Sequence, residues 1–68
     1  MAVDLRKARL HVWNEEEGRW FTQDDLAAAV GCSRVNITNI EAGKSKPSPD
    51  LAKRLAEVLG IEWTEFFA

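Results

Sequence analysis

The sequence predicts an all-α fold, a compact bundle of about five short helices in one domain that spans residues 1–68. The length supports this, because a chain of 68 residues has room for a single small core. Capping residues and glycines divide the chain into segments of helical length. The single cysteine, Cys32, excludes an internal disulfide framework, so packed helices have to supply the stability.

The first two helices are predicted from composition and from capping residues. We expect the first from Leu5 to about Trp13, because its composition favours a helix and contains no breaker, with an end before Gly18. The second is expected to begin after Thr22, whose hydroxyl can cap it. Asp25, three residues further on, completes a relative of the capping box.

A tight turn and a third helix follow. Gly31 supplies the positive φ that such a turn needs, and Ser33 can cap a helix that runs to about Ala42. Gly43 then stands where a helix end favours glycine. The spacing therefore predicts two helices joined by a tight turn.

The remaining chain predicts a fourth helix and a short final one. Ser48 and Pro49 are typical of an N-cap and a first helical position, and Gly60 ends the apolar periodicity that follows. From Ile61 to Phe67 we expect one or two helical turns that fold back on the core. These elements complete the bundle.

Composition and charge exclude several classes of protein. A formal net charge of −2 argues against a protein that coats nucleic acid indiscriminately. No apolar run is long enough for a signal peptide or a membrane span, so we expect a cytoplasmic protein without a membrane partner. No Cys/His cluster has metal-ligand spacing, so neither a metal nor another cofactor is expected. Basic residues do gather in one region, at Arg34, Lys44, Lys46, Lys53 and Arg54.

The outward face of the third helix is the candidate site for reading DNA. Helical rotation places Ile37 and Ile40 on the buried side. The side chains expected to face inward from the second helix, the turn and the third helix are Leu26, Ala27, Val30, Cys32, Ile37 and Ile40. An asparagine can bind adenine N6 and N7 together, an arginine can bind guanine O6 and N7, and an apolar tip can touch the thymine methyl. The side chains expected to read bases in the major groove are Arg34, Val35, Asn36, Thr38 and Asn39.

Residues beside this helix can contact the DNA backbone. The amide of Gln23 and the free N–H groups at the start of the second helix can meet a phosphate. The loop after the third helix carries lysines that can reach the far wall of the groove, although solvated surface lysines remain the alternative. The expected phosphate contacts are Gln23, Ser33, Lys44, Ser45 and Lys46.

Several motifs carry a family resemblance: LRKAR at residues 5–9, TQDDLA at 22–27, VGCS at 30–33, IxxIExG at 37–43, KP at 46–47 and LGIEWTEFF at 59–67. Together they resemble the Cro/cI-type, or XRE, family of lambda-repressor-like helix-turn-helix DNA-binding domains. The resemblance implies a five-helix bundle that binds operator DNA with its third helix, usually as a dimer. It also implies a phosphate contact for Gln23, base contacts for Arg34, Val35, Asn36 and Asn39, and an ion pair between Arg9 and Glu41.

The stretch of about residues 10–21 is longer than in that family pattern. Because Glu15 to Glu17 near a helix C-terminus would oppose the helix dipole, we expect a loop or a small hairpin that pairs the Trp13 and Trp20 regions. Its acidic run would repel phosphate, so it should lie away from the DNA face. Trp13 and Trp20 are expected to seal the core; the alternative is a protein-binding surface made of Trp13, Trp20, Trp63, Phe66 and Phe67.

Enzymatic function has little support, because His11 is the only histidine and no nucleophile with an orienting base is visible. The leading hypothesis is a sequence-specific regulator of transcription, a repressor that reads duplex DNA with the helix at residues 33–42. We expect a homodimer at least on DNA, associated with the nucleoid when bound. The alternative is a protein-interaction or antitoxin-like module that uses the aromatic insert and the C-terminus, with DNA binding secondary.

Overall fold

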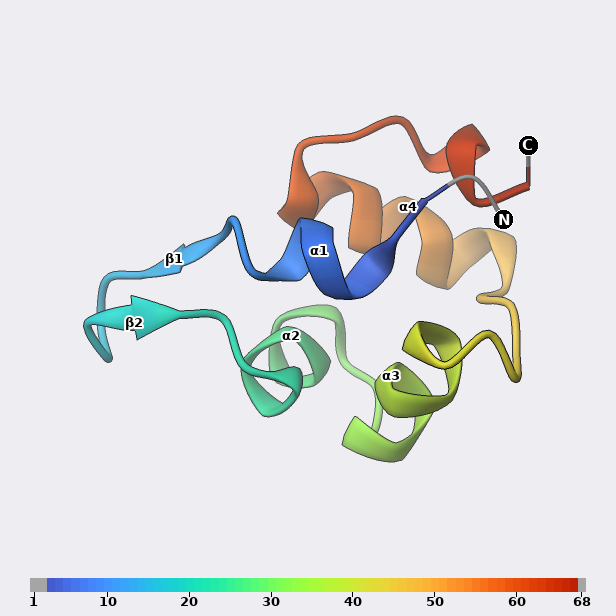
Figure 1. Ribbon diagram of the computed structural model, residues 1–68. Coiled ribbons are helices and arrows are strands. Elements are labelled where there is room, and N and C mark those ends of the chain that lie inside the picture. The colour runs from blue at the N-terminus through green and yellow to red at the C-terminus, as the bar shows by residue number, and fades with distance from the viewer. Residues whose placement is uncertain (1–2, 68) are drawn as a thin grey trace.

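The computed structural model describes residues 3–67. Within this range, short helices pack around one core and a two-stranded hairpin projects from it (Figure 1). The all-α prediction is confirmed, with the hairpin as its exception. No helix in this range is long and apolar enough to cross a membrane. In chain order the elements are α1 (Leu5–Arg9), β1 (Trp13–Asn14), β2 (Arg19–Trp20), α2 (Gln23–Val30), α3 (Arg34–Glu41), α4 (Pro49–Leu59) and the 3₁₀ helix η1 (Trp63–Phe67).

Helix α1 is shorter than the sequence predicts. The Val12 N–H donates to the Arg9 carbonyl oxygen at 3.1 Å, a tight turn contact that ends the helix. The Val12 carbonyl oxygen then accepts the Phe21 N–H at 2.8 Å. The prediction of a helix to about Trp13 is therefore wrong, because pairing with the returning strand takes the backbone groups that a longer helix would use.

The additional stretch at about residues 10–21, called the insert below, was expected to form a loop or a small hairpin. It forms a hairpin. Strands β1 and β2 are antiparallel, with Trp13 opposite Trp20 and Asn14 opposite Arg19. The Gly18 N–H donates to the Asn14 carbonyl oxygen at 2.8 Å. Gly18 has φ +66°, a conformation that glycine adopts without the steric penalty of a Cβ. The tight turn therefore brings the two tryptophans together.

The predicted caps and turn between α2 and α3 are present. Thr22 Oγ1 accepts the Asp25 N–H at 3.1 Å, and Asp25 Oδ2 accepts the Thr22 N–H at 3.0 Å, which completes a capping box. Gly31 ends α2 with φ +74°. Ser33 Oγ accepts the Asn36 N–H at 3.1 Å and caps α3. Hydrogen bonds between residues close in sequence thus fix where α2 and α3 begin, and Gly31 fixes the turn between them.

The core lies between α2, α3 and α4, with α1 and η1 closing it (Figure 1). Cys32, predicted to face inward, is only half-buried and packs against the edge of this core. The other side chains predicted to face inward from the second and third helices are buried. The buried apolar residues are Leu5, Leu26, Ala27, Val30, Ile37, Ile40, Ala52, Leu55, Ala56 and Phe66.

Two aromatic predictions are wrong. Phe66 is fully buried, so its side chain is not available to a partner protein. Trp13 and Trp20 do not seal the core, since they are 49% and 52% exposed. The physical reason is the hairpin, which carries both indoles away from the bundle while Phe21 packs against the core in their place.

Candidate nucleic-acid interface

Helix α3 presents the polar face that its periodicity predicts. Val35 is 64% exposed and the Arg34 side chain is 60% exposed. Thr38 is also exposed, while Asn36 and Asn39 are half-buried. The opposite side of the helix is closed, because Ile37 and Ile40 are buried in the core. The predicted base-reading residues therefore share one surface of a helix that its buried side holds in place.

Gln23 links the start of α2 to α3 rather than projecting freely. The Thr38 hydroxyl donates to Gln23 Oε1 at 2.9 Å, and Gln23 Nε2 donates to Glu41 Oε1 at 3.1 Å. Both ends of the Gln23 amide are therefore engaged. The backbone N–H groups of Gln23 and Asp24, in the first turn of α2, have no acceptor within the helix and remain suited to a phosphate.

The Arg9–Glu41 ion pair that the family resemblance implies is present. Arg9 Nε donates to Glu41 Oε2 at 2.7 Å and Nη2 donates to Oε1 at 3.2 Å. The Arg9 Nη1 group also donates to the Phe21 carbonyl oxygen at 2.7 Å. The two side chains are only 9% and 6% exposed. This pair joins α1, the entry to α2 and the end of α3, and so holds α2 and α3 in a fixed arrangement.

Asp24 lies in the candidate interface, although the sequence analysis did not single it out. Its Oδ1 lies 3.4 Å from Nε of Arg34, and the two side chains are 77% and 60% exposed. An aspartate in the first turn of a helix interacts well with the dipole, so its position beside Gln23 looked ordinary. In the folded protein its charge competes with any phosphate or base for the Arg34 guanidinium.

The loop after α3 leaves its two lysines accessible, whereas its serine is not. Lys44 and Lys46 are exposed. Ser45 differs from the prediction, because its Oγ is buried and has no hydrogen-bond partner within residues 3–67. Proximity in sequence made Ser45 look like its lysine neighbours, but the loop turns its side chain inward. Ser33 Oγ, at the start of α3, accepts the cap hydrogen bond and keeps its own proton for a phosphate.

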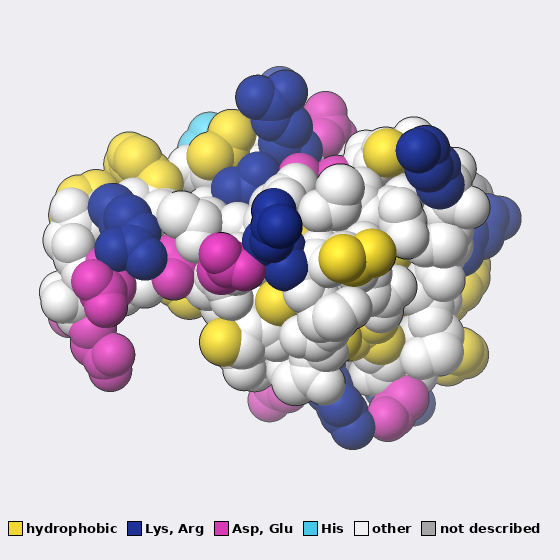
Figure 2. Space-filling view, turned by 90° about the horizontal axis from the view of Figure 1, so that it is seen from below, with side chains coloured by type: hydrophobic (Ala, Val, Ile, Leu, Met, Phe, Trp, Pro, Cys, Tyr) yellow, Lys and Arg dark blue, Asp and Glu magenta, His cyan; other side chains and the backbone are white. Residues whose placement is uncertain are grey.

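The basic residues predicted to gather in one region lie on two parts of the protein. Arg34, Lys44 and Lys46 belong to α3 and the loop after it, whereas Lys53 and Arg54 belong to α4. Lys53 lies over the Trp63 ring, with its Nζ 4.9 Å from the ring centroid. Arg54 donates to Asp50 Oδ2 at 3.0 Å. Both cations of α4 are therefore already engaged by neighbouring groups of the protein. Seen from the side of α2 and α3, acidic side chains are most frequent toward the hairpin end, where a basic side chain lies among them, and both kinds of charge also occur over the rest of the face (Figure 2).

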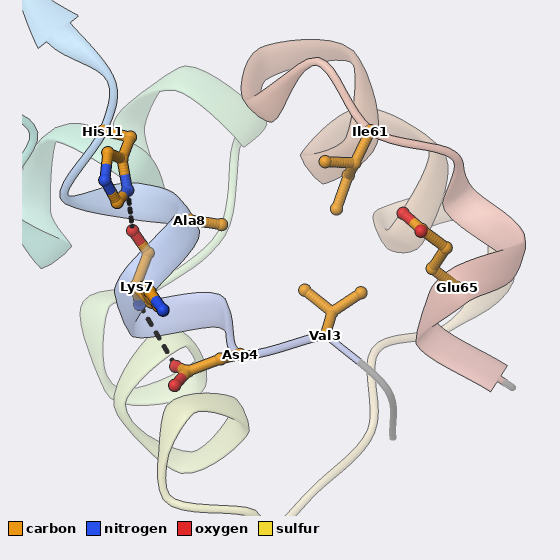
Figure 3. A pocket seen from close by; sticks show the side chains of 7 residues that line it. All are labelled: Val3, Asp4, Lys7, Ala8, His11, Ile61 and Glu65. Atoms are coloured by element: carbon orange, nitrogen blue, oxygen red, sulfur yellow. Dashed lines mark hydrogen bonds between the residues drawn. The ribbon is translucent and has the colours of Figure 1, made fainter.

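A hollow of about 330 Å³ lies between α1 and the C-terminal segment (Figure 3). His11 is part of its wall and points its ring back at the preceding helix, α1, where its Nδ1 donates to the Lys7 carbonyl oxygen at 2.8 Å. Within residues 3–67 no group of three or more His, Cys, Asp or Glu side chains can hold a metal. Burial raises the pKa of the Cys32 thiol, which disfavours the reactive thiolate. The residues that line the hollow are Val3, Asp4, Lys7, Ala8, His11, Ile61 and Glu65.

Two helices joined by a tight turn, the second with an open polar face and a buried apolar one, define the helix-turn-helix class. The sequence profile described as Helix-turn-helix matches residues 21–66 of the chain. The protein belongs to this helix-turn-helix family. The match begins two residues before α2, so the recognised part contains α2, α3, α4 and most of η1, but not α1 or the hairpin.

Several proteins similar to this chain are named as helix-turn-helix transcriptional regulators. The chain is 43% identical over 63 residues to "Uncharacterized HTH-type transcriptional regulator YqaF" of Bacillus subtilis, an alignment that covers 93% of this chain and 74% of that protein. It is 44% identical over 46 residues to a protein of Methanocaldococcus jannaschii named as an uncharacterized HTH-type transcriptional regulator, covering 68% of this chain and 70% of that protein. A similarly named protein of Methanothermobacter thermautotrophicus is 46% identical over 44 residues, which are 65% of this chain and 64% of that protein. No solved structure matches the chain.

Proposed function

We propose that this protein is a sequence-specific regulator of transcription that binds double-stranded DNA and represses by occupying an operator. The observation that carries the proposal is the open face of α3. There Val35 is 64% exposed beside Arg34, whereas Ile37 on the opposite side is fully buried. A β-branched residue gains little from an exposed helical position, so contact with a thymine methyl explains it better than solvent.

The proposed complex places α3 in the major groove. Arg34 is suited to guanine O6 and N7, and Asn39 and Asn36 are suited to adenine N6 and N7. The first turn of α2 meets a phosphate through its free N–H groups, while Lys44 and Lys46 reach the opposite strand. Phosphate contacts set the register and the α3 side chains supply the base preference.

A homodimer on DNA is part of the proposal. One domain of this size offers few base contacts, and two half-sites about 34–36 Å apart raise affinity and specificity together. The C-terminal aromatics support such a contact, since Phe67 is 44% exposed and packs edge-to-face with Trp63 at a centroid distance of 6.0 Å. The repressor is proposed to act in the cytoplasm, on the nucleoid, without a cofactor.

Selection from a randomised duplex pool at near-physiological salt tests this function. The wild type is expected to enrich two related half-sites one helical turn apart. On that site, Asn39→Ala should weaken binding by about 1–3 kcal/mol and relax the preference at one base position. Lys44→Ala should weaken binding to all duplexes equally and reduce the salt dependence.

Glu57→Gln, an exposed change on α4, is the matched control and should leave the site and affinity unchanged. Failure of the wild type to enrich any motif would contradict sequence-specific binding. Equal losses for Asn39→Ala on every duplex would contradict base reading by α3.

A second candidate function is favoured by the hairpin. Exposed tryptophans are typical of surfaces that bind other proteins. The antitoxin-like alternative used the aromatic residues of the insert and of the C-terminus, and the burial of Phe66 removes one of them from the surface. We therefore propose that protein binding accompanies DNA binding and does not replace it.

A further inference from the structure

The two hairpin tryptophans support each other instead of the core. Trp13 and Trp20 are about half-exposed, with ring centroids 5.0 Å apart and planes at 82°, an edge-to-face arrangement. Such a pair stabilises the hairpin while leaving a large area of both indoles in water. Tryptophan is also among the residues that contribute most to protein interfaces. The hairpin therefore presents a preformed aromatic surface.

A groove runs between this hairpin and α2. It is an open depression of about 640 Å³, a volume within the range of ligand-sized clefts. Its apolar part combines the rings of Trp13 and Phe21 with the small side chains of Ala28 and Ala29. Both alanines are exposed, so no other element covers this side of α2 within residues 3–67. The groove has room for an apolar side chain from another molecule.

The charge at the end of the groove indicates what kind of molecule fits. Glu15 and Glu16 line it and form no ion pair with any residue between 3 and 67. Glu17, by contrast, is paired with Arg19 at 3.1 Å. Two unpaired carboxylates beside an apolar floor repel nucleic-acid phosphate and favour a cationic ligand.

The groove is held open by contacts that do not depend on a ligand. Arg19 Nη2 donates to Asp25 Oδ1 at 3.1 Å, which ties the hairpin to the first turn of α2. Arg9 Nη1 donates to the Phe21 carbonyl oxygen at 2.7 Å, at the point where the hairpin returns to the bundle. A ligand therefore meets a site that needs little ordering.

We propose that this groove binds a basic segment of a partner protein. An aromatic or long aliphatic side chain of the partner enters between Trp13 and the two alanines, and adjacent Lys or Arg residues pair with Glu15 and Glu16. None of the residues predicted to contact DNA lines the groove. A neighbouring hollow contains Gln23 and Arg34 together with Trp20 and shares only Phe21 with the groove, so the two surfaces adjoin but have different linings. The partner and the operator can therefore be bound at once.

Selection of displayed random peptides against the purified chain, without DNA, tests the proposal. We expect enrichment of peptides that combine Lys or Arg with Trp, Phe or Leu. The double variant Glu15→Lys/Glu16→Lys should bind a selected peptide at least about tenfold more weakly. The double variant Glu57→Lys/Glu62→Lys makes the same charge change at exposed positions away from the groove and should bind normally.

Ala28→Gln is a further variant that keeps a good helix former and fills the groove without changing the charge. It should weaken peptide binding about tenfold, and circular dichroism would verify that the variant remains folded. Equal losses in the control double variant, or selected peptides without basic residues, would overturn the proposal. So would a wild-type dimer that the groove variants dissociate, because the occupant would then be a second copy of the chain.

Operator binding separates this inference from the proposed function. Glu15→Lys/Glu16→Lys should change affinity for the selected duplex no more than the control double variant does. A larger change would place the groove in the DNA interface and overturn the inference, whereas intact peptide binding without any selected duplex would contradict the repressor proposal alone.

Discussion

The substitution Glu41→Gln should strongly destabilise the fold. It keeps the shape of the side chain but removes the charge that faces Arg9, whose Nε lies 2.7 Å from Glu41 Oε2 in a pair only 9% and 6% exposed. The guanidinium would then be buried with the Phe21 carbonyl oxygen and a neutral amide as acceptors. Removal of one partner from a buried ion pair costs about 3–5 kcal/mol, and the remaining amide contact places Glu41→Gln near the lower end, at about 3 kcal/mol.

That loss is large for a chain of 68 residues. At about 0.05–0.15 kcal/mol per residue, a domain of this size has a total stability of roughly 3–10 kcal/mol. Urea unfolding followed by far-ultraviolet circular dichroism measures the difference. The variant should therefore unfold at a much lower urea concentration than the wild type, with little change in the slope of the transition.

A double variant separates the buried charge from the lost contact. Arg9→Met/Glu41→Leu removes both charges and should be more stable than Glu41→Gln, because no charge is left unpaired in the interior. Glu62→Gln, at an exposed position, is the control and should change stability by less than about 0.5 kcal/mol. If Glu41→Gln matches that control, or if the double variant is less stable than the single one, the argument about the pair is wrong.

Three other perturbations follow from the site and its supports. Asp24→Asn should strengthen binding to all duplexes by up to about 1 kcal/mol, because it frees Arg34 and removes an exposed negative charge near phosphate; titration of a fluorescent duplex measures this. Gly31→Ala should destabilise the fold by about 1–2 kcal/mol in urea unfolding, since φ is +74° there and the added Cβ would be strained without a clash. The backbone N–H of Thr22 holds the pKa of Asp25 below its usual value, so the carboxylate stabilises the folded state above pH about 4 and this contribution is lost as the pH falls through the folded-state pKa. Asp25→Asn should remove that acid dependence in unfolding curves recorded as a function of pH.

Each of these expectations can fail in a definite way. Weaker DNA binding by Asp24→Asn would mean that the aspartate orients Arg34 for reading rather than restraining it. Unchanged stability in Gly31→Ala would mean that the turn relaxes to a negative φ. An acid dependence that persists in Asp25→Asn would assign the effect to other carboxylates.

Much of the fold and part of the site were predictable because they depend on near neighbours in sequence. The boundaries of α2 and α3 follow from Thr22, Gly31 and Ser33, each of which bonds or bends the backbone within a few residues of itself. The outward position of Val35 and the inward position of Ile37 follow from helical periodicity. The Arg9–Glu41 pair joins residues far apart in the chain, and a family resemblance, not a local rule, implied it.

Other features were not predictable, because several partners compete for the same groups. Residues 10–12 have helix-forming composition, yet the Val12 carbonyl oxygen pairs with the Phe21 N–H of a returning strand. An exposed and a buried aromatic residue look alike in sequence, so Phe66 and the hairpin tryptophans could not be told apart. Ser45 was grouped with exposed lysines, although the path of the loop turns its hydroxyl inward.

The sequence by itself determined the helix-turn-helix unit, its caps and the residues on the open face of α3. Their spacing sets geometry over one or two helical turns, where short-range hydrogen bonds and apolar periodicity dominate. Only the tertiary structure decided that the insert forms a hairpin. It also decided that the Gln23 amide bonds to Thr38 and Glu41 and that Arg34 forms an ion pair with Asp24. These contacts join segments distant in sequence, and their outcome depends on which groups the folded chain brings within hydrogen-bonding distance.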